Sequence, residues 1–396
     1  MRMFKPFLLS LAVVVSTLTP AHAEVPLTFG FSGSGYGHGV GMSQIGARAR
    51  AISGESATAI LTYYYKGVSV IPVVDTHTIR VNVGHLLKSA SFSVTGTNSS
   101  IQIFEGDIGE STTATPMLTH IDKKRLNFRV GPTGLITSPV AGSIFTVRWT
   151  GQDSVISLSH TGKSVRYRHG QMAIKVVKGA MEITNSLALR DQYLWGISEV
   201  PSGWPPAVLE AQAIASRSYA LSKISTIKAS CDCHVYDHIT DQNFAGFSKE
   251  SEAKVGALWK AAVNRTIIDT STSLAAIAKG KPIQAYFFSS SGGATQSTLD
   301  AWGTATSYTH SVPDAGSLDL KLNPRFVTWS ATTSQELAAK AFLLKDVVSL
   351  EIISRNSAGA VTYIKGTSSD GSTKLLRGDT FRSRVKIPSP YFNLTQ

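Results

Sequence analysis

Residues 76 to 177 carry the pattern that most restricts the fold of this chain. Short runs in which apolar and polar residues alternate follow one another, separated by Gly, Asn and Ser. Alternation with a period of two places apolar side chains on one face of a β-strand, and the separating residues favour turns. We therefore expect an antiparallel β module here, with no cluster of residues that could carry chemistry. Its runs are Thr78-Ile-Arg-Val-Asn-Val83, Ser91-Phe-Ser-Val94, Ile101-Gln-Ile-Phe104, Phe145-Thr-Val-Arg-Trp149 and Met172-Ala-Ile-Lys-Val-Val177.

The sequence on either side of this module predicts helices. Pro205-Pro206 can open a helix, because the first helical positions need no amide donor, and the Ala-rich run 207–223 follows directly. Its many small residues predict a helix buried on most sides. Residues 47–65 predict one or two short helices broken at Ser53-Gly54. With a buried strand expected over 282–288 and a tail of one helix and two strands after Ser334, the predicted fold class is α+β.

The first 23 residues have the composition of a secretory signal. Arg2 and Lys5 precede an apolar run from Phe7 to Val15, and Ala-His-Ala ends at position 23. Cleavage there leaves 373 of the 396 residues, enough for about two domains at roughly 150 residues each. No later apolar stretch reaches the length of about 18 residues that a membrane helix needs. We expect an exported chain, secreted or held at the cell wall, without a transmembrane segment.

Charge and cysteine content narrow the class of partner. The formal net charge is +12, and it stays basic at +10 without Arg2 and Lys5. An exported basic protein is not expected to meet nucleic acid, so anionic polymers of the cell envelope are the expected partners, with solubility as the alternative reason for the charge. The two cysteines, Cys231 and Cys233, cannot form a disulfide framework that spans the fold, so its stability must come from the burial of apolar side chains.

Four segments of this sequence resemble the SpoIID/LytB family of bacterial cell-wall proteins. They are Gly37-His-Gly-Val-Gly-Met-Ser-Gln44, Tyr193-Leu-Trp-Gly-Ile-Ser-Glu-Val-Pro201 with Trp204-Pro205, Ala211-Gln-Ala-Ile-Ala-Ser-Arg-Ser-Tyr-Ala220, and Ser289-Ser-Ser-Gly-Gly293 with Trp302-Gly303. Weaker similarity lies at Asp241-Gln242, Asn323-Pro324 and Gly378 to Phe381. The resemblance implies a SpoIID-like core with a buried Ala-rich helix over residues 178–396, preceded by the β-rich module at 76–177.

The order of these segments differs from that of many family members. There the His-Gly motif closes the domain, whereas here it lies near the start of the chain. We hypothesise that residues 24–75 complete the SpoIID core in space, as in a circularly permuted arrangement, so residues 37–44 should lie close to residues 199 and 289–293. The spacing Gly196-Ile-Ser-Glu199 is also slightly shorter than in many relatives.

Glu199 is the candidate catalytic residue. By resemblance it corresponds to the acid of lytic transglycosylases, which cleave the glycan between N-acetylmuramic acid (MurNAc) and N-acetylglucosamine (GlcNAc). Ordinary glycosidases need two carboxylates, but a lytic transglycosylase can use the muramyl 6-hydroxyl as an internal nucleophile, so one acid/base suffices. Desolvation beside Trp195 and Trp204 is expected to raise the pKa of Glu199 more than nearby helix amides lower it. The alternative is that Glu199 caps the helix.

The remaining candidate residues would bind substrate. His38, Ser43 and Gln44 could donate hydrogen bonds to sugar hydroxyl or acetamido groups, with a packed histidine in a Gly-rich turn as the alternative. Ser291 and Gly292 could form a groove wall, the alternative being a tight strand end; no His and Asp accompany them, which argues against a serine hydrolase. Gln212 lies near the helix start and could reach the groove, while Arg217 on the same helix is expected to pair with a carboxylate or with carbonyls.

Cys231-Asp-Cys-His234 with His238 offers ligands that suit zinc, and some relatives have a metal site near this region. A Cys-x-Cys spacing is less typical of zinc sites than Cys-x2-Cys, and in an oxidising compartment a small-loop disulfide between Cys231 and Cys233 is the rival. Any metal would be a structural zinc, and the reaction itself requires no cofactor.

Two hypotheses of different class result. The preferred one is a lytic transglycosylase that acts on peptidoglycan glycan strands. The rival, implied by LytB-type relatives, is a wall-binding protein without turnover that enhances a separate N-acetylmuramoyl-L-alanine amidase.

Overall fold

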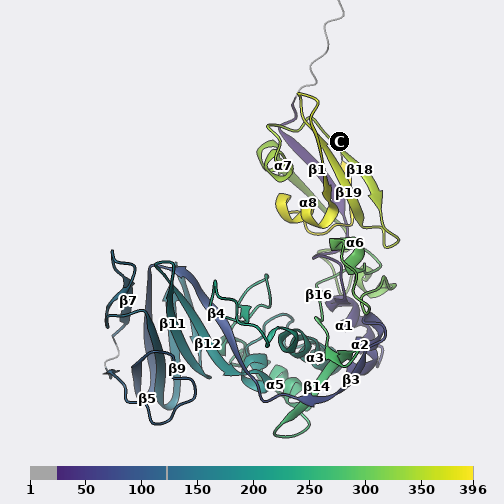
Figure 1. The fold of residues 1–396 in the computed structure, drawn as a ribbon. Coiled ribbons are helices and arrows are strands. Elements are labelled where there is room, and N and C mark those ends of the chain that lie inside the picture. The colour runs from purple at the N-terminus through teal and green to yellow at the C-terminus, as the bar shows by residue number, and fades with distance from the viewer. Residues whose placement is uncertain (1–24, 122–123, 396) are drawn as a thin grey trace, which may run out of the picture.

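The computed structural model describes residues 25–121 and 124–395, and the expected signal segment lies outside them. The described residues contain three hydrophobic cores, and the first of them spans both the large sheet and one side of the central helices. A β-sheet unit lies at one end of a bent molecule, the helical unit lies at the bend, and the C-terminal unit rises from it (Figure 1). Helices and several separate sheets occur together, so the α+β prediction is confirmed.

The β-sheet unit is built on a ten-stranded sheet. The strands along its path pair in the order β13-β4-β12-β11-β9-β5-β7-β8, with β10 added to β9 and β6 to β5. In the alternating runs of the sequence, every second side chain points into the core, which contains residues such as Val81, Phe92 and Ile174. The strands are β4 (Thr78–Leu87), β5 (Ser89–Glu105), β6 (Leu118–His120), β7 (Leu126–Val130), β8 (Ile136–Ser138), β9 (Ile144–His160), β10 (Lys163–Tyr167), β11 (Gln171–Val177), β12 (Ala180–Ala188) and β13 (Val235–Tyr236).

The sheet extends beyond the predicted module at 76–177. β12 continues it to Ala188, and β13 joins it in parallel to β4 from a loop more than 40 residues further along the chain. This extension ties the β-sheet unit to the segment that follows it, because β12 leads through the π-helical turn η1 (Leu189–Tyr193) directly to Glu199.

The helical unit is centred on α3 (Pro206–Lys223), the Ala-rich helix that the sequence predicts. Most of α3 is buried, because its small residues let α1, α2, α5 and β14 pack closely around it. Residues 47–65 form two helices interrupted at Ser53-Gly54, as expected. The elements are α1 (Gln44–Ile52), α2 (Ala57–Tyr64), α4 (Phe247–Glu250), α5 (Gly256–Arg265), α6 (Thr298–Trp302), η2 (Ala315–Leu318), β2 (Met42–Ser43), β3 (Ser69–Val74), β14 (Thr272–Ala278), β15 (Lys281–Pro282) and β16 (Phe287–Phe288).

The prediction of one strand over 282–288 is wrong in part. The structure has two short strands, β15 and β16, which belong to different sheets. Residues 283–286 between them have no regular structure. Their backbone forms hydrogen bonds with side chains and with other segments of the chain, including one that the Tyr65 hydroxyl donates to the Tyr286 carbonyl.

The C-terminal unit has its own core, which the sequence did not separate from the rest of residues 178–396. Its first strand, β1, comes from the other end of the chain and pairs with both β17 and β21. The predicted tail of one helix and two strands is present within a larger set of elements. These are β1 (Thr28–Gly33), β17 (Trp329–Ser334), α7 (Gln335–Phe342), β18 (Ser349–Arg355), β19 (Val361–Thr367), β20 (Thr373–Arg377), α8 (Gly378–Val385) and β21 (Phe392–Thr395).

Candidate functional site

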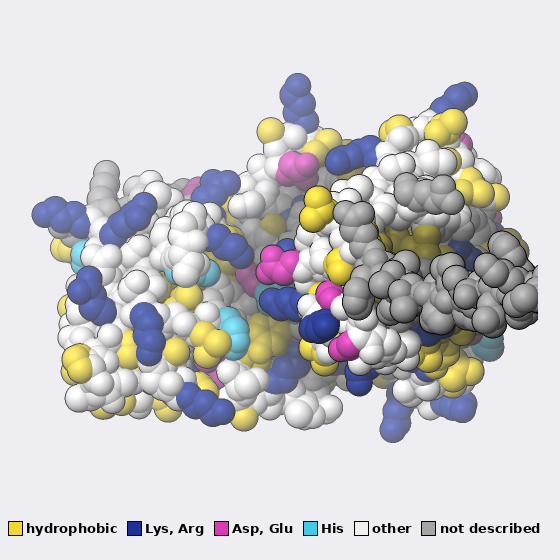
Figure 2. All heavy atoms as spheres, turned by 90° about the horizontal axis from the view of Figure 1, so that it is seen from above, with side chains coloured by type: hydrophobic (Ala, Val, Ile, Leu, Met, Phe, Trp, Pro, Cys, Tyr) yellow, Lys and Arg dark blue, Asp and Glu magenta, His cyan; other side chains and the backbone are white. Residues whose placement is uncertain are grey.

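A large groove of about 960 Å³ lies where the helical unit meets the C-terminal unit. Its walls come from the Gly-His-Gly segment, from Glu199, from the far end of α3, from the loop 239–241, from residues 284–289 and from α8 with the residues after it. Seen from above, the molecule is hollowed between its two ends, and both basic and acidic side chains stand around the hollow (Figure 2).

Glu199 lies in the wall of this groove, in the loop between η1 and α3. Its Oε1 accepts a hydrogen bond of 2.7 Å from the backbone amide of Asn243. Burial raises the pKa of the Glu199 carboxyl, and the Asn243 amide opposes this by favouring the anion. The expected direction of the pKa shift is therefore confirmed. Glu199 does not cap α3, since the N-cap is Pro205 and no side chain bonds the free amides there.

The backbone of Glu199 is tied to the early Gly-rich segment. Gln44 Nε2 donates to the Glu199 carbonyl at 3.3 Å and to Gln212 Oε1 at 3.2 Å. Gln212 Nε2 in turn donates to Ser216 Oγ at 3.1 Å, so one polar chain links α1, Glu199 and α3 inside the protein.

Residues 36–44 also lie directly beside residues 286–290. β2 pairs in parallel with β16, and Tyr36 forms a bridge with Ser290. Gly41 has φ +78°, and a Cβ there would meet the Tyr286 carbonyl oxygen at 2.0 Å, so only glycine allows this approach. The contacts expected between residues 37–44, Glu199 and residues 289–293 are present.

His38 faces the same groove in its neutral form. Its Nδ1 accepts a hydrogen bond of 3.1 Å from the Val40 amide, so the ring proton is on Nε2. Burial lowers the pKa of His38 to about 4, with Asp379 raising it and Arg382 lowering it to a smaller extent. The groove is thus lined by a histidine without charge at neutral pH and by a carboxyl group whose pKa is raised.

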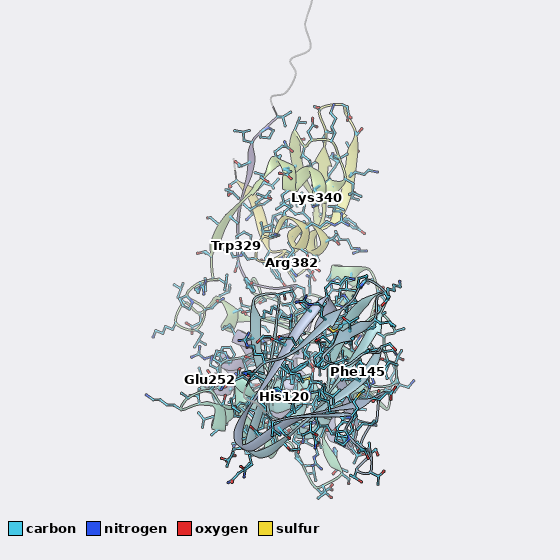
Figure 3. All side chains as sticks on the ribbon, turned by 90° about the vertical axis from the view of Figure 1, so that its left-hand side faces the viewer. His120, Phe145, Glu252, Trp329, Lys340 and Arg382 are labelled. Carbon is cyan, nitrogen blue, oxygen red and sulfur yellow. A yellow bond between two sulfur atoms is a disulfide. The ribbon has the colours of Figure 1, made fainter. Side chains whose placement is uncertain are left out.

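An aromatic and acidic cluster joins His38 to the C-terminal unit. The Trp302 ring lies 5.3 Å from the His38 ring and 4.8 Å from the Tyr286 ring. The Trp302 indole Nε1 donates to Asp379 Oδ2 at 2.9 Å, and Arg382 Nε donates to Asp379 Oδ1 at 2.7 Å. Figure 3 shows Arg382 at the end of the C-terminal unit that faces the rest of the chain. This cluster closes one wall of the groove.

A second carboxylate, Asp241, lines the groove but is already held by the protein. Its Oδ1 accepts from the Tyr219 hydroxyl at 2.8 Å, and its Oδ2 accepts from Lys228 Nζ at 2.8 Å and from the Tyr236 amide at 2.9 Å. The Asp241 side chain is 4% exposed. Among the described residues that line the groove, Glu199 is therefore the carboxyl group that is available for chemistry.

Four of the predicted substrate-binding residues do not line this groove. Ser43, Gln212 and Ser291 are fully buried and have partners inside the protein: Ser43 Oγ caps α1 at the Gly46 amide, and Ser291 Oγ donates to Asp314 at 2.6 Å. Gly292 packs against the Tyr391 ring and lines a separate cavity. These four residues have structural roles, and of the predicted set His38 and Gln44 remain in the groove.

The expectation that Trp195 and Trp204 bury the Glu199 carboxyl is wrong. Trp195 turns away, stacking with Lys260 at 4.2 Å and donating to Asn264, while Trp204 lies under Arg48. Neither lines the groove, whose aromatic residues come from other segments, among them Tyr36, Tyr219, Tyr286 and Trp302.

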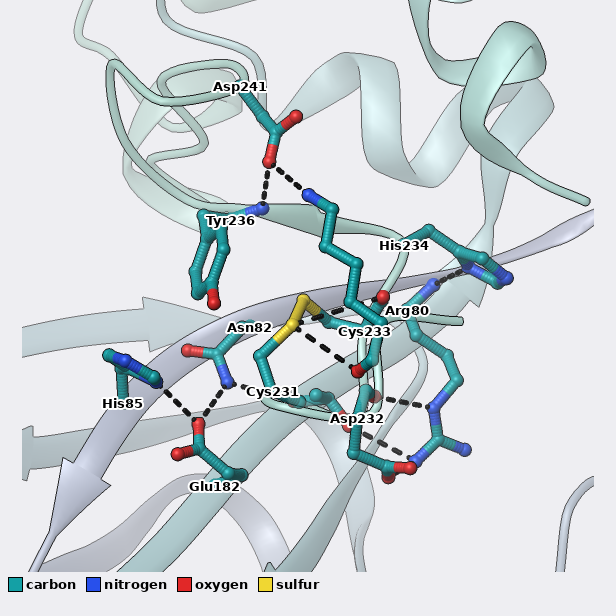
Figure 4. Close-up of a disulfide and its surroundings, with 12 residues drawn as sticks. Arg80, Asn82, His85, Glu182, Cys231, Asp232, Cys233, His234, Tyr236 and Asp241 are labelled. Carbon is teal, nitrogen blue, oxygen red and sulfur yellow. Dashed lines mark hydrogen bonds and ion pairs between the residues drawn. A yellow bond between two sulfur atoms is a disulfide. The ribbon is translucent and has the colours of Figure 1, made fainter. Parts of the chain in front are cut away.

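Cys231 and Cys233 are joined in a disulfide (Figure 4). Their sulfurs are therefore not available as thiolate ligands. His234 is buried and its Nδ1 accepts from the Arg80 amide at 2.9 Å, whereas His238 is exposed and bonded to Thr240. Within residues 25–121 and 124–395, no group of three or more His, Cys, Asp or Glu is placed to hold a metal ion. The structure thus replaces the predicted zinc site with the disulfide that the sequence left open.

Sequence reasoning missed the roles of Trp302, Asp379, Arg382 and Asn243. The signal was partly present, because Trp302 and the stretch from Gly378 to Phe381 belong to the segments that carry the resemblance. Asn243 acts through its backbone amide, which no residue pattern marks.

Comparison with known proteins finds similarity over parts of this chain. An uncharacterized protein of Brachyspira hyodysenteriae is 26% identical over 233 residues, which cover 57% of this chain and 58% of that protein. The match thus spans less than two thirds of that relative's length. No solved structure matches the chain. Within the described part of the chain, no helix has the length and apolar character needed to cross a membrane. A family model named SpoIID, stage II sporulation protein, matches residues 177–270, so the segment that holds Glu199, α3 and the disulfide is similar to that family.

Proposed function

We propose that this protein is a peptidoglycan lytic transglycosylase in which Glu199 is the single general acid/base. The observation that carries the proposal is the state of Glu199: its carboxyl lies in a large groove, accepts one backbone amide, and has a pKa raised by burial. A general acid must keep its proton near the working pH, and a raised pKa serves this purpose. The SpoIID family is linked to the cell wall, which directs the choice of substrate to its glycan.

The state of Asp241, the other carboxylate of the groove, favours a reaction that uses one acid. Hydrolysis by the usual two-carboxylate routes needs a nucleophile or a base besides the acid. Asp241 is occupied by three donors and nearly buried, so it is not free to activate water or to attack a sugar. A substrate that brings its own nucleophile removes this requirement.

The reaction then runs through one carboxyl group. The Glu199 proton passes to the oxygen that leaves with GlcNAc, and the bond from that oxygen to muramyl C1 breaks. The muramyl 6-hydroxyl oxygen forms the new bond to C1, and its proton passes to the Glu199 carboxylate. The products are a free GlcNAc 4-hydroxyl and a 1,6-anhydro-muramyl end, and Glu199 is protonated again.

The surrounding residues hold this geometry. Gln44 fixes the Glu199 carbonyl from the early segment, and the Asn243 amide orients the carboxyl group. Neutral His38 presents a hydrogen-bonding edge without a charge that would lower the pKa of Glu199. We extend the proposal to location and partners: the chain acts outside the cytoplasm on glycan strands, binds no nucleic acid, and needs no metal for turnover.

The test is product analysis on purified glycan strands, with and without stem peptides. Mass spectrometry should find anhydro-muramyl ends with the wild type and a loss of at least a hundredfold with Glu199→Gln, in line with about 10²–10⁴-fold for a general acid. Glutamine keeps the shape and can still accept from Asn243. Glu105→Gln, an exposed change at the end of β5, is the matched control and should retain full activity.

Two results would contradict the proposal. Anhydro ends that persist in Glu199→Gln would remove Glu199 from its role. No anhydro ends on any glycan, together with faster cleavage by an added amidase, would favour the enhancer of an N-acetylmuramoyl-L-alanine amidase.

A further inference from the structure

Glu199 borders a second cavity as well as the large groove. This minor pocket of about 420 Å³ is lined by residues 198–201 together with Ala245, Ser248, Lys249 and Glu252. Its volume lies within the range of about 300–1,000 Å³ that small-ligand sites occupy. Glu199 is the residue that lines both cavities.

One chain segment forms a wall of both cavities in sequence. Ile239, Thr240 and Asp241 line the large groove. Asn243 follows and donates to Glu199, and then Ala245 and Ser248 line the minor pocket. The same segment therefore contributes to both cavities, on either side of the Asn243 amide that bonds Glu199.

The minor pocket is a preformed site with free hydroxyl groups. Lys249 is 5% exposed, and its Nζ donates to the Val200 carbonyl at 2.7 Å. Ser202 Oγ donates to Glu252 Oε2 at 2.7 Å. These bonds fix the floor and one side. Among the described residues, the side-chain hydroxyls of Ser198 and Ser248 have no hydrogen-bond partner, so both can bind a sugar hydroxyl or an acetamido group.

The two cavities differ in charge. The large groove carries Lys223, Arg382 and Lys386 against the Asp241 carboxylate, so the side chains that line it are net positive. In the minor pocket Lys249 Nζ lies 3.6 Å from Glu252 Oε2, so these two opposite charges offset each other. A muramyl residue bears a carboxyl-linked side group and GlcNAc does not. Electrostatics therefore favour the muramyl residue on the side of the large groove and the uncharged GlcNAc in the minor pocket.

We propose that the minor pocket is the leaving-group subsite, which binds the GlcNAc whose 4-oxygen takes the Glu199 proton, while the muramyl part of the strand lies in the large groove. This inference rests on the proposed function, because it assigns the two sides of the bond that Glu199 would cleave. It also sets the direction of the strand: the reducing side leaves through the minor pocket.

The subsite can be tested by binding without turnover. In the Glu199→Gln background, calorimetry measures the affinity of the full chain for chitobiose and chitotetraose, uncharged GlcNAc oligomers of two and four sugars. Ser248 is exposed on the short helix α4, so Ser248→Phe fills the minor pocket without entering the core. Ser251→Phe places the same ring three residues away on an exposed turn outside both cavities and is the matched control. Ser248→Ala removes only the hydroxyl.

We expect chitotetraose to bind more tightly than chitobiose, because only the longer oligomer reaches both cavities. Ser248→Phe should weaken chitotetraose binding at least tenfold, Ser248→Ala by up to about threefold, and Ser251→Phe by less than twofold. Unchanged chitotetraose affinity in Ser248→Phe, equal losses in both Phe variants, or no binding by the parent would overturn the subsite. Because this assay needs no cleavage, its failure is separate from a failure of the wild type to form anhydro-muramyl ends.

Discussion

At the scale of single residues, burial shifts the pKa values of Glu199 and His38 in opposite directions. It raises the pKa of the Glu199 carboxyl and lowers that of the His38 imidazole, because in both cases it penalises the charged form. The groove therefore keeps both groups neutral over a wider range of pH than free side chains would allow. Sequence reasoning predicted both the direction for Glu199 and desolvation as its cause, but it assigned the burial to Trp195 and Trp204, which contact other residues.

The state of His38 can be measured directly. Nuclear magnetic resonance of ring-labelled histidine should show His38 titrating with a midpoint of about 4. His38 pairs with no carboxylate that would hold a proton on it, because Asp379 is occupied by Trp302 and Arg382. The stability that neutral His38 lends the fold should be present above pH 6.5 and be lost as pH falls through about 4. A midpoint at or above the ordinary histidine value of 6.5 would contradict this.

Arg217 shows how a buried charge holds α3 in place. It is fully buried, with Nε donating to Asp75 Oδ2 at 2.9 Å and other nitrogens donating to Thr266, Leu274 and Arg190. The expectation that it pairs with a carboxylate and with carbonyls is confirmed.

Arg217→Met should lower the free energy of unfolding by about 3–5 kcal/mol, because it leaves Asp75 buried and unpaired. Arg265→Met is the matched control: it breaks an exposed pair with Glu210 and should cost about 1 kcal/mol or less. Urea unfolding followed by circular dichroism measures both. Equal losses for the two variants would show that the Arg217 network does not anchor the helix.

At the scale of elements, regular patterns were predictable and contacts between distant segments were not. Period-two alternation located the strands of the β-sheet unit, and the alanine run located α3, because both are set by local side-chain patterns. β13 could not be found in this way, since its two residues join the sheet only through tertiary contacts. Residues 283–286 were expected to be a strand because three of the four are apolar, but backbone groups there form hydrogen bonds with other segments, such as the Tyr286 carbonyl with Tyr65 and Met42.

The loop that carries the disulfide decides between the two readings of Cys231 and Cys233. Purified protein should show no free thiol before reduction and no stoichiometric zinc by elemental analysis, because the sulfurs bond each other. Replacing both cysteines by serine should cost about 1–2 kcal/mol, since the closed loop is very short. One zinc per chain together with two reactive thiols would restore the metal site.

At the scale of the whole molecule, the groove exists because the helical unit meets the C-terminal unit. The early Gly-rich segment, residues 199–289 and the C-terminal unit each supply walls, and β1 pairs with strands from the far end of the chain. The sequence predicted that residues 37–44 would return to Glu199, because the motifs of one family were present in a different order. It did not separate the C-terminal unit, since no linker or shift in composition marks its boundary. The division of the chain into domains at 75 and 177 stays a prediction.

The bond between Trp302 and Asp379 should matter for activity, because it joins α6 to α8 across the two units. Asp379→Ala should lower kcat/KM on glycan about tenfold, the equivalent of about 1.4 kcal/mol, and increase hydrogen exchange in residues 299–303 and 377–386. Asp370→Ala, an exposed change in a turn of the same unit, is the control. Unchanged exchange and activity in Asp379→Ala would mean that the contact does not hold the wall of the groove.

The central claim, that burial raises the pKa of the Glu199 carboxyl, is tested most directly by its titration. Carbon-13 resonance of the labelled Glu199 carboxyl, assigned by its loss in Glu199→Gln, should give a midpoint above the ordinary glutamate value of 4.5. The same should hold with chitotetraose bound. A Glu199 midpoint at or below 4.5 in the bound state would contradict the account.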